Sequence, residues 1–332
     1  MDKLPLAIDV SKATLDYQTM DKKNRDLQTG TLENQVATIN DFLSGYDSSQ
    51  YFIVAEPTGT YSDKLLEVAH QLGFEIRLVN PKKSSQYSDI LGILNKTDTS
   101  AAFVLFEMGR NKKLEIPQFI PQSKVLKERK QVQMALNALS KQERTVKNQI
   151  HALEQCVNFS ESVMDAYQNI LTTVQQQKKV LNKQLQQLSD TEIKEFTRLA
   201  QSVVGIGPKM TSLLMVYTNG LKYFDHKTQL PKFVGIVPSS HRSGTSVNKK
   251  MGITKSGPSD LRACLYSAAN SAKRFNHACK AIYERLCAKG KPHKVAMMAV
   301  MNKLLHQVFA VVKSSTLFDN DLYFRNAAQI NK

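Results

Sequence analysis

Cysteine is scarce in this 332-residue chain, which also lacks a long apolar run and a signal-peptide pattern. The four cysteines form no CxxC pair, and their spacing relative to His277 and His293 matches no zinc template, so we expect reduced thiols and no zinc site. No stretch approaches 18 apolar residues, and the N-terminus MDKLPLAIDV does not resemble a secretory leader. We therefore expect a cytoplasmic protein with no membrane partner.

Positive charge is concentrated toward the C-terminus. The formal net charge is +16, and Lys plus Arg less Asp plus Glu gives −4 over residues 1–110, +5 over 111–200 and +15 over 201–332. So basic a region indicates a polyanionic partner, and nucleic acid fits best because no amphipathic membrane helix or lipidation signal accompanies it. The alternative is a lysine-rich surface that only solubilises the protein.

The N-terminal part has the pattern of an α/β domain. Three successive strands are predicted over residues 4–10, 13–20 and 26–33. There follow a helix over 34–45, a buried strand that stops at Pro57, a helix with Ser62 as N-cap and Gly73 past its end, and a strand in EIRLVNP. One last helix is expected from about Thr97. The order β-β-β-α-β-α-β-α predicts helices packed on a mixed sheet.

The rest of the chain is predicted to be mainly helical. From about 120 to 190, apolar residues recur at alternating steps of three and four, which predicts a helical hairpin or coiled coil that turns near NFSES. Arg129 and Glu143 occupy two positions of this seam, which suggests a surface for assembly or a simple spacer. Residues 238–259 are rich in Ser, Gly, Pro and Lys, so we expect a long loop, and such loops are usually functional.

Three carboxylates stand where an α/β sheet can bring them together. Asp9 lies within the apolar strand LAIDVS, Glu56 ends the strand FIVAE, and Asp98 opens the last helix of the domain. A buried carboxylate is costly unless compensated, and a divalent cation relieves the repulsion within such a cluster. Asp98 as a helix cap and Glu56 as a lysine partner are the simpler alternatives.

Two further motifs lie in the basic part. VVGIGPKM allows a tight turn between two helices and can present backbone N–H groups and Lys209 to a phosphate, although a helix C-cap followed by Pro208 explains the same residues. SSHRSGTSVNKK places four serines beside cations, so a hydroxyl could attack a phosphate there. A flexible serine-rich loop without chemistry is the alternative.

Together these motifs resemble the DEDD transposases of insertion sequences that use a bridge RNA, whose relatives include the Piv-type DNA invertases. The resemblance rests on AIDVSKATLD, AEPTGTY and NKTDTSAA, followed by VVGIGP, FVGIVPSSHRSG and GITKSGPSDLR. It implies a RuvC-like RNase H domain over 1–115, a coiled-coil hairpin over 116–195 and a mainly α transposase domain over 196–332. It further implies Mg²⁺ held by Asp9, Glu56 and Asp98, and a nucleophilic Ser243 in a dimer or tetramer.

Ala101 departs from this resemblance. The family pattern is KTDxxDA, and an aspartate at this position would stand beside Asp98, because residues three apart share a helix face. Glu107 does not replace it, since nine residues place it about 180° around the helix. Alanine is the best helix former, so the fold should be undisturbed while one ligand is missing. Either an inactivating substitution holds an uncut nucleic-acid complex, or the catalysis of a natural copy has decayed.

The resemblance therefore implies an RNA-guided DNA transposase or recombinase, impaired at Ala101, that acts on donor and target DNA. Phosphate contacts, which depend on salt, are predicted for Lys209, Arg242, Lys249, Lys250, Lys255 and Arg262. One alternative is a site-specific invertase of the same chemistry without a guide RNA. The others are a hydrolytic junction nuclease and a non-enzymatic nucleic-acid-binding protein.

Overall fold

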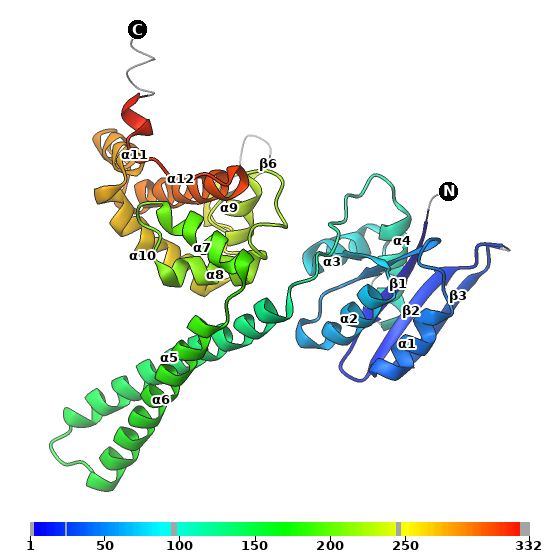
Figure 1. The fold of residues 1–332 in the computed structure, drawn as a ribbon, viewed down its shortest axis with the longest axis horizontal. Coiled ribbons are helices and arrows are strands. Elements are labelled where there is room, and N and C mark those ends of the chain that lie inside the picture. Colours follow the sequence, from blue (N-terminus) through cyan, green and yellow to red (C-terminus); the bar gives the residue numbers. More distant parts are fainter. Residues whose placement is uncertain (1–2, 24, 94–97, 244–246, 326–332) are drawn as a thin grey trace. The chain divides into compact units, whose positions relative to one another are not determined.

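A computed structural model describes residues 3–23, 25–93, 98–243 and 247–325, and for residues 98–99 and 240–251 it describes the backbone alone (Figure 1). The chain divides into two compact units, Met1–Pro121 and Gln122–Lys332. The predicted boundaries near 115 and 195 stay predictions.

The first unit is built on a five-stranded mixed sheet with the order β3-β2-β1-β4-β5. The strands are β1 (Leu4–Val10), β2 (Thr14–Met20), β3 (Leu27–Glu33), β4 (Tyr51–Ala55) and β5 (Glu75–Leu78). β1 runs antiparallel to β2 and parallel to β4, which in turn is parallel to β5. All five residues of β4 are buried, as expected for a central strand with helices on both faces.

Helices cover both faces of this sheet. α1 (Val36–Ser44) and α2 (Asp63–Gln71) pack their apolar side chains against Ile8 and Ile53. α4 (Asp98–Arg110) packs on the opposite face, against Ala7 and Val54, with α3 (Pro81–Ile90) beside it. Gly109 permits this close packing, because a Cβ there would lie 2.7 Å from Pro5 Cβ and 2.9 Å from Val54 Cγ2.

The predicted elements of this unit are confirmed with two corrections. α3 was missed: Asn80 caps it by accepting from the Lys82 backbone N–H, and Pro81 occupies its first turn. Ser62 precedes α2 as predicted but does not cap it. Its Oγ instead accepts a 2.7 Å hydrogen bond from the Thr58 backbone N–H, because Ser62 ends a short 3₁₀ turn. Gly73 lies past α2 with φ +77°, as predicted.

The second unit begins with the predicted helical hairpin, formed by α5 (Lys124–Glu154) and α6 (Glu161–Gln187). Its polar seam residues have partners inside the hairpin. Arg129 Nη1 donates to the carbonyls of Leu185 and Leu188, at 2.6 and 2.7 Å near the end of α6. Glu143 pairs with Lys147 on its own helix and with Lys178 across the seam. The assembly surface suggested by these residues stays a prediction.

In the described part of the second unit, six further helices surround one apolar core. They are α7 (Thr191–Ser202), α8 (Pro208–Thr218), α9 (Gln229–Val234), α10 (Ser259–Phe275), α11 (His277–Ala288) and α12 (His293–Ser314). Among the described helices, α12 is the one long and apolar enough to cross a membrane by composition. Half of its apolar window is buried inside the unit, and Val300, Leu304 and Val308 are fully buried in the core.

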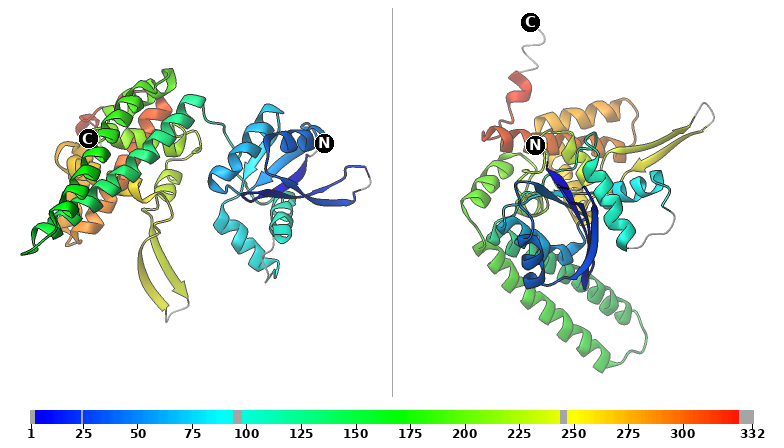
Figure 2. Two further views of the ribbon diagram at one scale, coloured as in Figure 1. Left: turned by 90° about the horizontal axis from the view of Figure 1, so that it is seen from below. Right: turned by 90° about the vertical axis from the view of Figure 1, so that its right-hand side faces the viewer.

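The expected loop over 238–259 is wrong in part, because the backbone forms an antiparallel ribbon there. β6 (Pro238–Ser243) pairs with β7 (Val247–Ile253), and the ribbon extends away from the helices (Figure 2). The sequences of both strands, PSSHRS and VNKKMGI, lack the regular apolar alternation by which a strand is recognised.

Candidate functional site

Asp9 and Glu56 lie at the same level on neighbouring strands. β1 and β4 pair Ile8 with Ala55, so the next residue on each strand stands about 4.8 Å from its neighbour. Since side chains alternate between the two faces, these residues share the face of Ala7 and Val54, which is covered by α4. Both carboxylates are half-buried.

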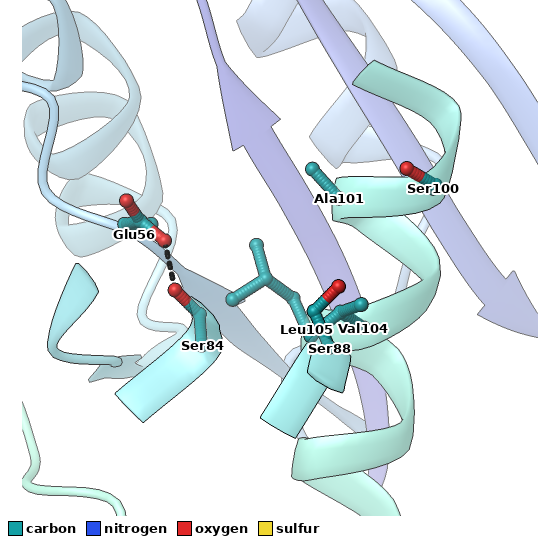
Figure 3. Close-up of a pocket in the computed structure, with 7 residues that line it drawn as sticks. All are labelled: Glu56, Ser84, Ser88, Ser100, Ala101, Val104 and Leu105. Carbon is teal, nitrogen blue, oxygen red and sulfur yellow. Dashed lines mark hydrogen bonds between the residues drawn. The ribbon is translucent and has the colours of Figure 1, made fainter. Parts of the chain in front are cut away.

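Glu56 opens onto a small pocket that α3 and α4 complete. Its Oε2 accepts a 2.5 Å hydrogen bond from the hydroxyl of Ser84, which is 4% exposed. The pocket has a volume of ≈ 10 Å³, room for about one water molecule. Its walls also include Ser100, Ala101 and Leu105 (Figure 3).

Ala101 therefore stands where the sequence indicated a missing ligand. Its methyl group lines the same pocket as the Glu56 carboxylate (Figure 3). α4 begins at Asp98, as predicted, but the Asp98 side chain lies outside the described residues. Glu107 forms a 3.1 Å ion pair with Arg110 farther along α4 and does not line the pocket.

The carboxylate oxygens of Asp9 and Glu56 are the kind of ligand that a hard divalent cation prefers. Among the side chains that the structure describes, no three His, Cys, Asp or Glu residues converge closely enough to hold a metal ion. Asp9 and Glu56 supply two carboxylates from neighbouring strand positions. The side chain of the third predicted ligand, Asp98, lies outside the described residues. The chemistry of these oxygen donors fits Mg²⁺, and the side chain of Ala101, which lines the same pocket, has no donor atom.

Sequence reasoning missed three residues around these acids. Asp16 stands directly opposite Asp9 in the β1–β2 pair, and its Oδ1 accepts a 2.5 Å hydrogen bond from the Thr31 hydroxyl. Ser84 lies on the helix that was not predicted. The third is Asn34. Strand alternation could have indicated the face of Asp16, but the register that pairs it with Asp9 could not be read from one sequence.

Asn34 connects the two segments that follow the acids. Its side chain is 4% exposed, and its Nδ2 donates to the carbonyls of Ser11 and Tyr61, at 2.9 and 3.1 Å. Ser11 is two residues beyond Asp9, and Tyr61 is five residues beyond Glu56. The amide therefore fixes the spacing of the loops that leave β1 and β4.

The predicted nucleophile lies on the ribbon of the second unit. Ser243 ends β6 and pairs with Val247. Its side chain and those of Arg242, Lys249 and Lys250 lie outside the described residues. The root of the ribbon is tightly packed, because a Cβ on Gly257 would lie 1.9 Å from the Phe233 carbonyl oxygen.

The remaining predicted phosphate contacts differ in their surroundings. Lys209 is exposed in the first turn of α8, and Lys255 is exposed at the ribbon root with φ +53°. The Arg262 guanidinium donates to the carbonyls of Val234 and Gly257, so it braces the ribbon root. Their contacts with phosphate stay predictions.

The GxG motif forms the tight turn that was predicted between two helices. Gly205 has φ +107°, and a Cβ there would lie 2.7 Å from the Ala272 Cβ on α10. Gly207 is the N-cap of α8, with Pro208 in the first turn. Phosphate binding by this turn stays a prediction.

Comparison with known proteins agrees with this arrangement. Residues 6–157 match the profile of a DEDD transposase domain of the IS110 type, and residues 197–284 match that of the transposase IS116/IS110/IS902 family. The pilin gene-inverting proteins of Moraxella bovis and Moraxella lacunata are each 28% identical over 97% of this chain and 100% of their own length. An uncharacterized 43.6 kDa protein of insertion element IS110 from Streptomyces coelicolor is 23% identical over 48% of this chain and 38% of its own length.

The mixed five-stranded sheet, with Asp9 near the end of β1 and Glu56 directly after β4, is that of an RNase H-like DEDD domain. The matches identify the protein class as a transposase or DNA recombinase. The chain belongs to the IS110/IS116/IS902 transposase family and is distantly related to the pilin gene-inverting proteins. The predicted fold class and this family are confirmed. Membership implies DNA binding and the use of a divalent metal.

Proposed function

We propose that this protein is a transposase that cuts and rejoins donor and target DNA through the hydroxyl of Ser243, guided by a bridge RNA. Asp9, Glu56 and Asp98 would hold Mg²⁺, and the copy is impaired because Ala101 supplies no ligand. The main support is that Glu56 and Ala101 line the same pocket. Asp9 occupies the position on β1 that neighbours Glu56. Every other predicted acid position is filled.

The residues of the chain have separate roles in this proposal. Mg²⁺, when bound by Asp9, Glu56 and Asp98, would polarise the scissile phosphate and stabilise its developing charge. The Ser84 hydroxyl orients the Glu56 carboxylate toward that site. Ser243 Oγ loses its proton and forms a bond to phosphorus, while the bond from phosphorus to one deoxyribose oxygen breaks and that oxygen gains a proton. The resulting phosphoserine link conserves the energy needed for rejoining.

The basic residues of the second unit supply the proposed binding of DNA and RNA. Their contribution is mainly electrostatic, so affinity should fall steeply with salt. Lys209 and Lys255 are exposed and suited to substitution, whereas Arg262 also braces the backbone and would disturb the fold when replaced. A dimer or tetramer would let the acids of one protomer serve the serine of another, within the cytoplasm.

The decisive experiment restores the missing acid. Ala101→Asp protein is incubated with Mg²⁺ and labelled donor and target DNA, beside the double variant Ala101→Asp with Ser243→Ala. Ser239→Ala in the same background is the matched control, because Ser239 lies four residues earlier on the same strand. A covalent protein–DNA adduct that requires Ser243 but not Ser239 is the expected result.

Other outcomes favour the rival functions. Free DNA ends without an adduct, unchanged by Ser243→Ala, would identify a hydrolytic nuclease in which water attacks. If the acid-restored protein neither cuts nor joins DNA with any divalent metal, a non-enzymatic nucleic-acid-binding role gains support.

A site-specific invertase without guide RNA is the second candidate. It is favoured by the similarity to pilin gene-inverting proteins, which spans 97% of this chain. Sequencing of RNA that co-purifies with the protein separates the two. A discrete structured RNA supports the guided transposase, and DNA rejoining by RNA-free protein supports the invertase.

A further inference from the structure

A groove lies within the second unit, where the helical hairpin meets the start of α8. Its volume is ≈ 400 Å³, and α5, α6 and the first turn of α8 form its walls. Three cationic side chains, Arg129, Lys178 and Lys209, line it together with amides and hydroxyls. No carboxylate is among its lining residues in the part of the chain that the structure describes.

Two of the three cations that line this groove, Arg129 and Lys209, form no ion pair within 4 Å among the described residues. Arg129 uses Nη1 for two backbone carbonyls, its buried Nε has no partner, and it forms no ion pair within 4 Å among the described residues. Lys209 is exposed and likewise forms no ion pair in that set, while Lys178 pairs with Glu143. Burial lowers the pKa of the Arg129 guanidinium more than the attraction of Asp190 raises it. Since the burial of this charge is not fully compensated, an anion in the groove would stabilise the arrangement.

The start of α8 adds a second attraction for anions. Its N-cap, Gly207, has no side chain to bond the N–H groups of the first turn, and Pro208 follows. The 11-residue helix therefore presents free donors and the positive end of its dipole beside Lys209. Pro208 and Lys209 both line the groove, so this charge faces the same space as Arg129.

A row of fixed amides lies along the floor of the groove. The Ser212 hydroxyl donates to Gln133 Oε1 at 2.8 Å, and Gln133 Nε2 donates to Asn137 Oδ1 at 3.2 Å. Asn137 Nδ2 then donates to Asp260 Oδ2 at 2.6 Å. Each amide nitrogen has a second hydrogen, and this network fixes its orientation. Oriented amides beside cations are suited to base edges and sugar hydroxyls next to phosphates.

We propose that this groove binds an unpaired segment of a nucleic-acid strand, with its phosphodiester against Arg129 and Lys209 and its base or sugar against the amides. The inference rests on the proposed function as a nucleic-acid-binding transposase. It assigns a binding site separate from the three acids and from the β6–β7 ribbon. A space of ≈ 400 Å³ accommodates a nucleotide but not a duplex. DNA and RNA share the phosphodiester, so the experiment must separate them.

Binding of labelled oligonucleotides to the full chain tests this without any cleavage. Ten-nucleotide single-stranded RNA, ten-nucleotide single-stranded DNA and a DNA duplex are titrated by fluorescence anisotropy at several salt concentrations. Asn182→Trp fills the groove, and Gln187→Trp is its control, because both positions are exposed on α6 and Gln187 does not line the groove. Lys209→Ala is compared with Lys179→Ala, an exposed lysine of α6 outside the groove.

We expect Asn182→Trp and Lys209→Ala each to weaken binding of a single strand about tenfold, with both controls within about twofold. Lys209→Ala should also reduce the salt slope by about 0.7. A loss confined to RNA or to DNA, or shared by both, supports the site and identifies its strand. Equal affinities for the groove variants and their controls, or a loss limited to the duplex, would overturn the inference.

These outcomes are independent of the proposed chemistry. If the Ser243 adduct forms while the groove variants bind single strands normally, the proposed groove site is refuted and the proposed transposase function is supported. If no adduct forms but Asn182→Trp selectively lowers the affinity for a single strand, the proposed groove site is supported and the proposed chemistry is refuted.

Discussion

Replacing Ala101 by aspartate should create a metal-dependent gain in the stability of the first unit. The new carboxylate would enter the pocket that Glu56 lines, whose free volume is ≈ 10 Å³. Without metal, two carboxylates about 6 Å apart near the surface repel by about 2–3 kcal/mol. The lower helix propensity of aspartate adds about 0.6 kcal/mol, and the nearby helix N-terminus offsets about 0.5 kcal/mol.

The net cost in EDTA is therefore about 2–3 kcal/mol. For a unit the size of Met1–Pro121 this lowers the melting temperature by about 10–15 °C, since 1 kcal/mol corresponds to about 5 °C. Mg²⁺ at about ten times its dissociation constant restores about 1.4 kcal/mol, or about 7 °C. The unaltered chain has one ligand fewer, so its shift with Mg²⁺ should be below about 2 °C.

Differential scanning calorimetry of the full chain, with EDTA or Mg²⁺, measures both quantities. Ala101→Asn is the matched control, because asparagine has the shape of aspartate without its charge. It should show neither the full loss in EDTA nor the recovery with Mg²⁺. Equal Mg²⁺ shifts for Ala101→Asp and Ala101→Asn would refute the placement of the metal at this pocket.

Three further predictions concern other contacts. Asn34→Ala should lower the free energy of unfolding by about 2 kcal/mol in denaturant titrations and reduce the Mg²⁺ shift of Ala101→Asp, because its amide holds two loops. Hydrogen bonds from the lysines around Glu143, led by Lys147, lower the pKa of that carboxyl to about 2, below its value of 4.5 in the unfolded chain. Its stabilisation is therefore complete above pH 4.5 and lost as the pH falls toward 2, and Glu143→Gln should remove this dependence in circular dichroism. Tyr217→Phe should cost about 1–2 kcal/mol in calorimetry, since the hydroxyl bonds Asp260.

The sheet could be predicted because its strands carry their own signal. β1 and β4 are apolar runs bounded by turn residues, and the acids at their ends were visible by position. α3 was not predicted because it has no apolar stripe. Its buried residues are Ser84 and Ser88, so a search for apolar periodicity finds nothing to detect. The residue that orients Glu56 was missed for the same reason.

Pairing register is the second limit of a single sequence. The alignment of Ile8 with Ala55, and of Asp9 with Asp16, depends on how whole strands pack, and no local pattern encodes it. The ribbon of β6 and β7 was likewise expected to be a loop, because its sequence is rich in polar residues and has no apolar alternation to recognise.

The pocket explains why alanine at position 101 is compatible with an intact fold. A methyl group there fills a half-buried position on α4 and leaves only ≈ 10 Å³ free, so no large cavity opposes it. Alanine also favours the helix and removes a charge that would repel Glu56 when no metal is bound. The apoprotein is therefore more stable with alanine than with the acid, and bound metal offsets part of the cost of the aspartate. The stability of the fold therefore does not favour an aspartate at position 101, and the alanine leaves the predicted phosphate-contacting residues of the second unit unchanged.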